Sequence, residues 1–185
     1  MATTTTLIKH ITFLLLLLLF VLIASPIVNA MLVKDVHAFC KETNDVNFCL
    51  KYIGADKRIS AARDLNDVLL IVFSQCKIQV TEATKHISKV RQKFSGPIGK
   101  ERIKFCERNY GLASGLFQEA YETGKQKALA YRAHLTAQSG SDYVRKCEEE
   151  WKKNGPIQKS PVTFYNTNVI KLFSIIRVII SKVKT

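Results

Sequence analysis

The chain lacks the short motifs by which catalytic and metal sites are most readily found in a sequence. It contains no C-x-x-C, no H-E-x-x-H, no G-x-S-x-G and no phosphate-binding G-x-x-x-x-G-K-[ST]. No two histidines stand at ligand spacing, and no cluster of histidines and acids completes a site. We therefore expect no catalytic residue, no metal site and no cofactor.

Two features that could suggest chemistry have simpler explanations. The run Glu148-Glu149-Glu150 could supply paired carboxylates, but at the end of an expected helix it is more typical of a solvated surface. Trp151, the only tryptophan, could stack on a sugar, but it follows Cys147 by four residues and is expected to pack beside a disulfide there. The histidines downstream of residue 30 are expected to be solvated or to lie at the margin of the core; they are His37, His86 and His134.

Acidic residues are scarce, with 15 Asp and Glu against 28 Lys and Arg, so the formal net charge is +13. A balance this basic favours acidic partners: an acidic protein face, acidic pectin, or nucleic acid. The chain has no aromatic and basic motif of an RNA-binding type, and the secretion argued below also disfavours nucleic acid. Several basic residues are scattered and are expected to be ordinary solubilising surface, namely Lys100, Arg102, Lys104, Lys125 and Lys127. No N-x-[ST] acceptor occurs, which predicts an unglycosylated chain.

The N-terminal 30 residues have the pattern of a cleavable signal peptide. Lys9 precedes an apolar run over residues 11–23, which is too short to span a bilayer, and small residues at Val28 and Ala30 mark a cleavage site. A retained anchor is the alternative, but no stop-transfer pattern follows. Removal of residues 1–30 takes away one lysine and no acid, so the secreted chain 31–185 would carry a charge of +12 and have no membrane association.

Hydrophobic periodicity indicates an all-α domain. Apolar residues recur at steps of three and four from Leu65 to Phe94, and Ser95-Gly96-Pro97 ends that stripe. A second helix is expected to stop near Gly124. Its buried face would carry Ile103, Cys106, Tyr110, Ala113, Phe117 and Ala120.

Two further helices complete the expected bundle. The third would bury Ala128, Tyr131, Leu135, Cys147 and Trp151, with a kink at Ser139-Gly140-Ser141. The fourth would begin after Ser160 as N-cap and Pro161 as first helical residue, and its stripe would be Val169, Leu172, Ile176, Ile179 and Val183. Four helices joined by short turns predict an up-down-up-down bundle over residues 60–185.

A shorter helical hairpin is expected to precede the bundle, over residues 31–56. Cys40 and Cys49 stand symmetrically about Asn44-Asp45, so two antiparallel helices that turn there would bring the two cysteines level. The hairpin has little apolar surface of its own. We therefore expect Phe39, Phe48 and Tyr52 to need the bundle or a partner chain for burial.

The other cysteines are harder to pair. The distances of Cys106 and Cys147 from a turn at Gly124 differ by about five residues, or roughly 7.5 Å, whereas a disulfide needs Cα atoms within about 7 Å. We expect a kink or bulge at residues 139–141 to shorten the path from the turn to Cys147, so that the two cysteines can still meet. Pairing Cys76 with Cys106 would leave roughly 15 Å between them. Cys76 is therefore expected to be a free thiol in the core, and a reactive or intermolecularly paired thiol is the alternative.

Several segments resemble the plant pectin methylesterase and invertase inhibitor family. These are Phe39-Cys40-Lys41-Glu42-Thr43, Phe48-Cys49-Leu50, Gly54-Ala55-Asp56-Lys57-Arg58 with Asp64-Leu65, Cys106-Glu107-Arg108-Asn109-Tyr110 and Cys147-Glu148-Glu149. The resemblance implies a helical hairpin and a four-helix bundle, with bridges Cys40–Cys49 and Cys106–Cys147. It also implies a secreted, non-enzymatic inhibitor that acts in the cell wall (apoplast) or the vacuole and binds across the cleft of a carbohydrate enzyme.

Two target enzymes fit the resemblance. Members that resemble invertase inhibitors carry Pro-Lys-Phe after the second bundle helix, and only Lys127 matches in Gln126-Lys127-Ala128. Lys127 is accordingly the one candidate target-binding residue, and pectin methylesterase is slightly favoured over acid invertase. A basic pectin methylesterase would, however, be repelled at long range by this charge. A non-inhibitory wall protein that binds pectate through its charge is the remaining alternative.

Overall fold

The computed structural model describes residues 14, 33–153 and 155–183. Apart from Leu14, the predicted signal peptide lies outside the described residues. Within the described part of the chain, no helix is both long enough and apolar enough to cross a membrane.

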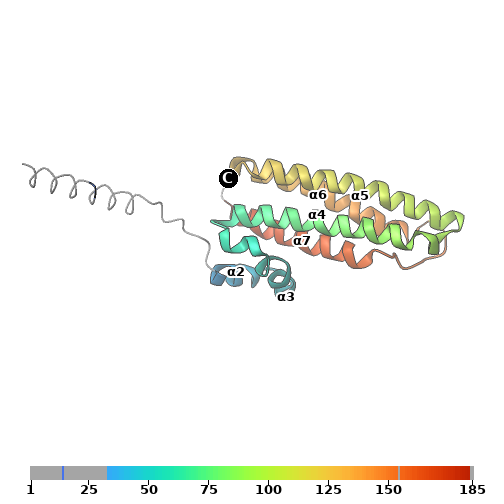
Figure 1. Ribbon diagram of the computed structural model, residues 1–185, viewed down its shortest axis with the longest axis horizontal. Coiled ribbons are helices and arrows are strands. Elements are labelled where there is room, and N and C mark those ends of the chain that lie inside the picture. Colours follow the sequence, from blue (N-terminus) through green and yellow to red (C-terminus); the bar gives the residue numbers. More distant parts are fainter. Residues whose placement is uncertain (1–13, 15–32, 154, 184–185) are drawn as a thin grey trace, which may run out of the picture.

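Four long helices pack side by side along the long axis of the molecule (Figure 1). They are α4 (Leu65–Val90), α5 (Pro97–Gly124), α6 (Ala130–Glu150) and α7 (Thr163–Lys182). Each of α5 and α7 packs against both α4 and α6, which is the arrangement of an up-down-up-down bundle. The predicted all-α bundle with a preceding helical hairpin is therefore confirmed.

The helix ends follow from local chemistry. Asp64 caps α4, because its carboxylate accepts hydrogen bonds from the amides of Asn66 at 3.0 Å and Asp67 at 3.1 Å. After α4 a 3₁₀ turn, Arg91–Phe94, leads to Gly96, and α5 starts with Pro97 at its first turn. We call the end of the bundle formed by residues 91–96, 151–153 and 155–162 the distal end.

Helix α6 differs from the prediction in two respects. It is continuous from Ala130 to Glu150, so the kink expected at residues 139–141 is wrong. The connection before it spans residues 125–129 and is centred on Gln126 and Lys127, nearly midway between Cys106 and Cys147. The mismatch in register therefore disappears without any irregularity inside the helix.

The buried face of α6 is made of small residues. Tyr131 and Leu135, which were expected in the core, are 53% and 45% exposed. The residues that face the core are Ala130, Ala133, Ala137, Gly140, Ser141, Val144 and Cys147. A Cβ on Gly140 would lie 3.2 Å from the Phe117 ring of α5, so the two helices approach too closely for a larger side chain.

The hairpin consists of α2 (Val33–Cys40), α3 (Val46–Cys49) and a π-helical turn, Leu50–Gly54. It lies against α4 and α7, on the side away from α5 and α6 (Figure 1). Phe39 and Phe48 are buried, and Asn168 of α7 donates a hydrogen bond to the Tyr52 hydroxyl at 2.9 Å. The bundle thus covers the aromatic side chains that the hairpin cannot bury by itself.

Candidate functional site

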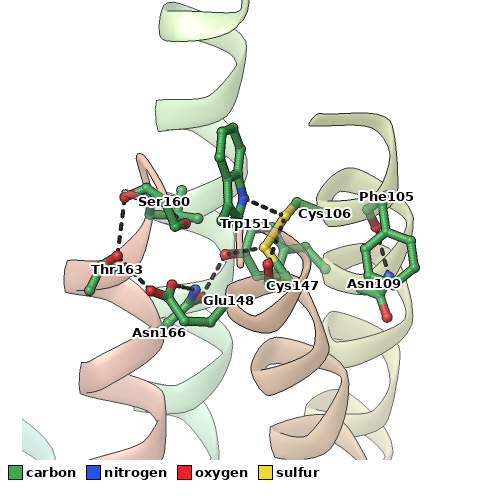
Figure 2. The surroundings of a disulfide bond; sticks show 11 residues. Phe105, Cys106, Asn109, Cys147, Glu148, Trp151, Ser160, Thr163 and Asn166 are labelled. Carbon is green, nitrogen blue, oxygen red and sulfur yellow. Dashed lines mark hydrogen bonds between the residues drawn. A yellow bond between two sulfur atoms is a disulfide. The ribbon is translucent and has the colours of Figure 1, made fainter. Parts of the chain in front are cut away.

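A disulfide joins α5 and α6 near the distal end. The sulfur atoms of Cys106 and Cys147 are 2.07 Å apart and their Cα atoms are 4.8 Å apart. Trp151 is buried beside the bridge, and its indole Nε1 donates a hydrogen bond to the Cys106 sulfur at 3.4 Å (Figure 2). The bridge and the indole hold the two helices at a fixed separation.

A polar network beside this bridge ties α7 to α5 and α6. The Tyr110 hydroxyl donates to Asn166 Oδ1 at 2.6 Å, and Asn166 Nδ2 donates to Glu148 Oε2 at 2.6 Å. Thr163 Oγ1 donates to the other Glu148 oxygen at 2.7 Å (Figure 2). Burial raises the pKa of Tyr110, which keeps its hydroxyl protonated as a donor. Glu148 is thus a link between helices and not part of a wholly solvated acidic run.

Arg102 fixes the connection that closes the distal end. It was expected on the surface but is only 1% exposed, so that expectation is wrong. Its guanidinium donates to the carbonyl oxygens of Lys153 at 2.6 Å and Pro156 at 3.1 Å, and it lies 5.6 Å from the Trp151 ring centre. The planar fork of arginine suits two acceptors on one loop and an aromatic face together.

The hairpin has its own bridge. The sulfur atoms of Cys40 and Cys49 are 2.03 Å apart, and their Cα atoms are 5.5 Å apart. Asp45, in the turn between them, caps α3 through the amide of Phe48 at 3.0 Å and accepts from Lys171 of α7 at 2.7 Å. The hydrogen bond from Lys171 is the main reason that the pKa of Asp45 is lowered. The turn is thus closed covalently and anchored to the bundle.

The fifth cysteine, Cys76, is in α4 and has no disulfide partner. It is fully buried, and burial raises the pKa of its thiol. A protonated and inaccessible thiol is a poor nucleophile, so this geometry offers no reactive cysteine.

The structure places Lys127 in the connection between α5 and α6. Its side chain is 60% exposed and pairs with Asp64, the N-cap of α4. Burial raises the pKa of Asp64, but the hydrogen bonds from Lys127 and from the amide of Asp67 outweigh this and leave the pKa lowered. Lys127 also borders a hollow of about 500 Å³ together with Leu65, Ala128 and Val183. The candidate target-binding lysine is therefore exposed and held in place.

Among the described residues, no group of three or more His, Cys, Asp or Glu could hold a metal ion. His134 stacks on Phe173 with ring centres 5.5 Å apart, and burial lowers its pKa. His86 lies 5.7 Å from the Tyr165 ring. These two histidines pack against aromatic rings as structural side chains do, and His37 is exposed.

The outer surface of α5 and α6 combines apolar side chains with cations. Leu112 is 47% exposed, and Tyr131 and Leu135 lie on the outer side of α6. Arg108 and Arg132 are exposed on the same two helices. Exposed aromatic, aliphatic and arginine side chains on a rigid scaffold are typical of surfaces that bind other proteins.

Sequence reasoning missed two residues that shape this scaffold, Arg102 and Glu148. A signal for Arg102 existed, since it precedes Cys106 by four residues and so shares the buried face of α5. No comparable signal marked Glu148, because its partners Thr163 and Asn166 belong to another helix.

Comparisons with known proteins agree with this architecture. Residues 34–179 match the family described as plant invertase/pectin methylesterase inhibitor. The chain is 51% identical over 181 residues to pectinesterase inhibitor 5 of Arabidopsis thaliana, covering 98% of this chain and 99% of that protein. The crystal structure of a mutant form of a pectin methylesterase inhibitor from Arabidopsis is similar in fold, with a TM-score of 0.63 at 19% identity over 78% of this chain and 94% of that one. A second crystal structure, of a pectin methylesterase inhibitor from Arabidopsis thaliana, has a TM-score of 0.58 at 18% identity and covers 82% of this chain and 97% of that one. The chain therefore belongs to the plant invertase/pectin methylesterase inhibitor family and is an inhibitor-type protein, not an enzyme.

Proposed function

We propose that this chain is a secreted inhibitor of pectin methylesterase, which blocks the active-site cleft of the enzyme by binding across it. The observation that carries the proposal is the 51% identity, over nearly the whole chain, to a protein named as a pectinesterase inhibitor. The two bridges and the Arg102 contacts support it, because a scaffold that is already ordered loses little conformational entropy on binding.

The site of action follows from the predicted signal peptide. Cleavage after Ala30 would release residues 31–185 to the cell wall, with the vacuole as the alternative. The N-terminal sequence of the protein recovered from the medium of expressing plant cells tests this. A mature chain that begins at Met31 is expected, and retention of the leader would contradict it.

Titration of two enzymes with the purified oxidised protein tests the proposed target. We expect loss of pectin methylesterase activity as a one-to-one complex forms, measured from about pH 4 to pH 8. Inhibition of acid invertase alone would move the target to that enzyme. Loss of neither activity would contradict the proposal.

Lys127 is proposed to contact the target. Replacement of Lys127 by Ala should weaken inhibition by roughly tenfold if the ammonium group is buried against an acidic group of the enzyme. Lys125→Ala is the matched control, because Lys125 lies in the same connection and pairs with Glu122 at 2.6 Å. Equal effects of the two substitutions on the inhibition constant would show a general charge effect and remove the specific role of Lys127.

Acidic pectin is proposed as a second partner. The formal charge of +13 supports attraction to polyuronate, which is the product of the methylesterase reaction. Charge by itself names no site for such a ligand on the protein.

A further inference from the structure

A hollow of about 410 Å³ lies at the distal end, between the 3₁₀ turn that follows α4 and the first turns of α5. Its rim carries the cations Arg91, Lys100 and Lys104, and Ile103 contributes an apolar wall. Gln92 and Ser95 add groups that can hydrogen-bond to hydroxyls. The hollow therefore combines positive charge, an apolar surface and neutral polar groups.

The two lysines of this hollow are exposed to solvent. Among the described residues, neither Lys100 nor Lys104 forms an ion pair. Six other lysines are paired with acids, whereas Lys41, Lys51, Lys57, Lys77 and Lys146 form no ion pair within the described residues. The pairs are Lys85 with Glu82, Lys125 with Glu122, Lys127 with Asp64, Lys153 with Glu149, Lys171 with Asp45 and Lys182 with Glu42.

The distal end gathers further cations of this kind. Lys89, Lys93, Lys152 and Lys159 also lie at or next to that end and form no ion pair within the part of the chain that the structure describes. Acids also lie at this end. Glu107, which is paired with Arg91, and Glu101 are near the hollow, and Glu149, which is paired with Lys153, and Glu150 stand at the end of α6. The local excess of positive charge thus remains available to an external anion.

The spacing of the cations favours a linear polyanion. Lys100, Lys104 and Arg108 stand one helical turn apart on α5, with a rise of about 6 Å between successive members. A polyuronate presents carboxylates at regular intervals along its chain, which suits a row of cations at regular spacing. The hollow offers no exposed aromatic platform of the kind that stacks nucleic-acid bases, since its lining residues are not aromatic.

We propose that this distal hollow binds de-esterified pectin, a polyuronate, through Lys100 and Lys104. The inference rests on the proposed function in that the inhibitor and the polymer would meet in the wall. Hydrolysis of a methyl ester turns a neutral group on the polymer into a carboxylate, so the hollow would retain the inhibitor where the enzyme has already acted.

Binding of polygalacturonate oligomers to the full oxidised protein tests the proposal, with titration calorimetry at low and moderate salt. The double substitution Lys100→Gln/Lys104→Gln should weaken binding by about tenfold or more and reduce its dependence on salt. The matched control is Lys41→Gln/Lys57→Gln, which removes the same charge from exposed positions on and after the hairpin and should change affinity less than about twofold. Fully methyl-esterified oligomers should not bind.

Three outcomes would overturn the proposal: no binding of the oligomers, an equal loss of affinity in both double variants, or equal binding of esterified and free oligomers.

Ile98 and Ile157 are exposed at the same end, so vesicles with anionic lipid form a further arm of the test. Binding to vesicles that exceeds binding to polygalacturonate would make the site a membrane surface. Inhibition of pectin methylesterase is measured on the same variants with a short soluble ester. If the protein inhibits the enzyme but does not bind pectate, the proposal for the hollow fails and the proposed function stands. If it binds pectate but does not inhibit the enzyme, the proposed function fails and the hollow stands.

Discussion

At the scale of single residues, Arg102 has the largest consequence for the scaffold. Among the described residues, no other charged residue is buried. Its cost of burial is offset by carbonyl acceptors on residues 153 and 156 and by the face of Trp151. The distal connection therefore depends on one side chain that reaches it from α5.

Arg102→Ala should lower the free energy of unfolding by about 3 kcal/mol, because it leaves the Lys153 and Pro156 carbonyls without this donor and opens space beside Trp151. Arg102→Lys should recover only part of this, since one ammonium group cannot reproduce the fork. Urea unfolding followed by tryptophan fluorescence measures both variants. The exposed Arg132→Ala is the control and should stay within about 0.5 kcal/mol of the parent protein.

Asp56 predicts how stability responds to acid. Hydrogen bonds from the Arg58 side chain lower its pKa from 3.8 to about 2, against the opposing effect of burial. A lowered folded-state pKa stabilises the fold above the unfolded value, and this contribution is lost as the pH falls from about 4 to about 2. Because Arg58 is partly solvated, we expect about 1 kcal/mol. The parent protein should have a higher free energy of unfolding than Asp56→Asn. This difference should be constant above about pH 5 and should become smaller below pH 4. A gap that widens in acid would refute the assignment, and Arg58→Gln should reproduce the narrowing.

At the scale of elements, the packing of α5 on α6 sets what each helix can accept. Phe117 is fully buried and faces Gly140, where an added Cβ would lie 3.2 and 3.3 Å from its ring carbons. Gly111 and Gly115, on the outer side of α5, would meet nothing within 4 Å. Three helical glycines thus stand in two different environments.

These environments predict opposite effects of alanine. Gly111→Ala and Gly115→Ala should each raise the free energy of unfolding by about 0.5–1 kcal/mol through helix propensity. Gly140→Ala should lower it by about 1 kcal/mol, because overpacking against Phe117 outweighs the same gain. Thermal unfolding of the three single variants gives the comparison. Stabilisation by all three would mean that α5 and α6 are not as close as described.

The two bridges should contribute unequally to stability. Cys106–Cys147 closes a loop with a sequence separation of 41, whereas Cys40–Cys49 closes one of 9. On the chain-entropy model their removal should cost about 4 and about 2.5 kcal/mol, respectively. Double Cys→Ser variants of each pair, compared by urea unfolding, test this order. In the variant without the Cys40–Cys49 bridge, the rate of amide hydrogen exchange should rise chiefly in α2 and α3. A rise throughout the bundle would show that the hairpin does not unfold separately from it.

At the scale of the whole molecule, the hairpin is an appendage held by α7. Lys171 binds Asp45 at 2.7 Å and Lys182 binds Glu42 at 2.6 Å, while Asn168 contacts Tyr52. These contacts leave the outer faces of α5 and α6 and the distal end uncovered within the described chain. The molecule thus has separate surfaces for a protein target and for a polyanion.

Much of this organisation was predictable because it depends on local chemistry. The apolar stripe from Leu65 and the turn at Gly96-Pro97 predict α4 and its end, and the structure agrees. The prediction was wrong for Tyr131 and Leu135, because hydrophobicity favours large apolar residues as core. Close approach of two helices selects alanine and glycine in their place.

The sequence by itself determined the fold class, the helix boundaries to within a few residues and the absence of the catalytic motifs sought, since periodicity and turn residues act over short distances. The tertiary structure alone decided which face of α6 is buried, that Arg102 is inside, that Glu148 joins two helices and that Lys100 and Lys104 border a hollow with Arg91. Each of these features depends on contacts between side chains of helices that are distant in sequence. Periodicity and turn residues act over short distances, so they do not predict such contacts.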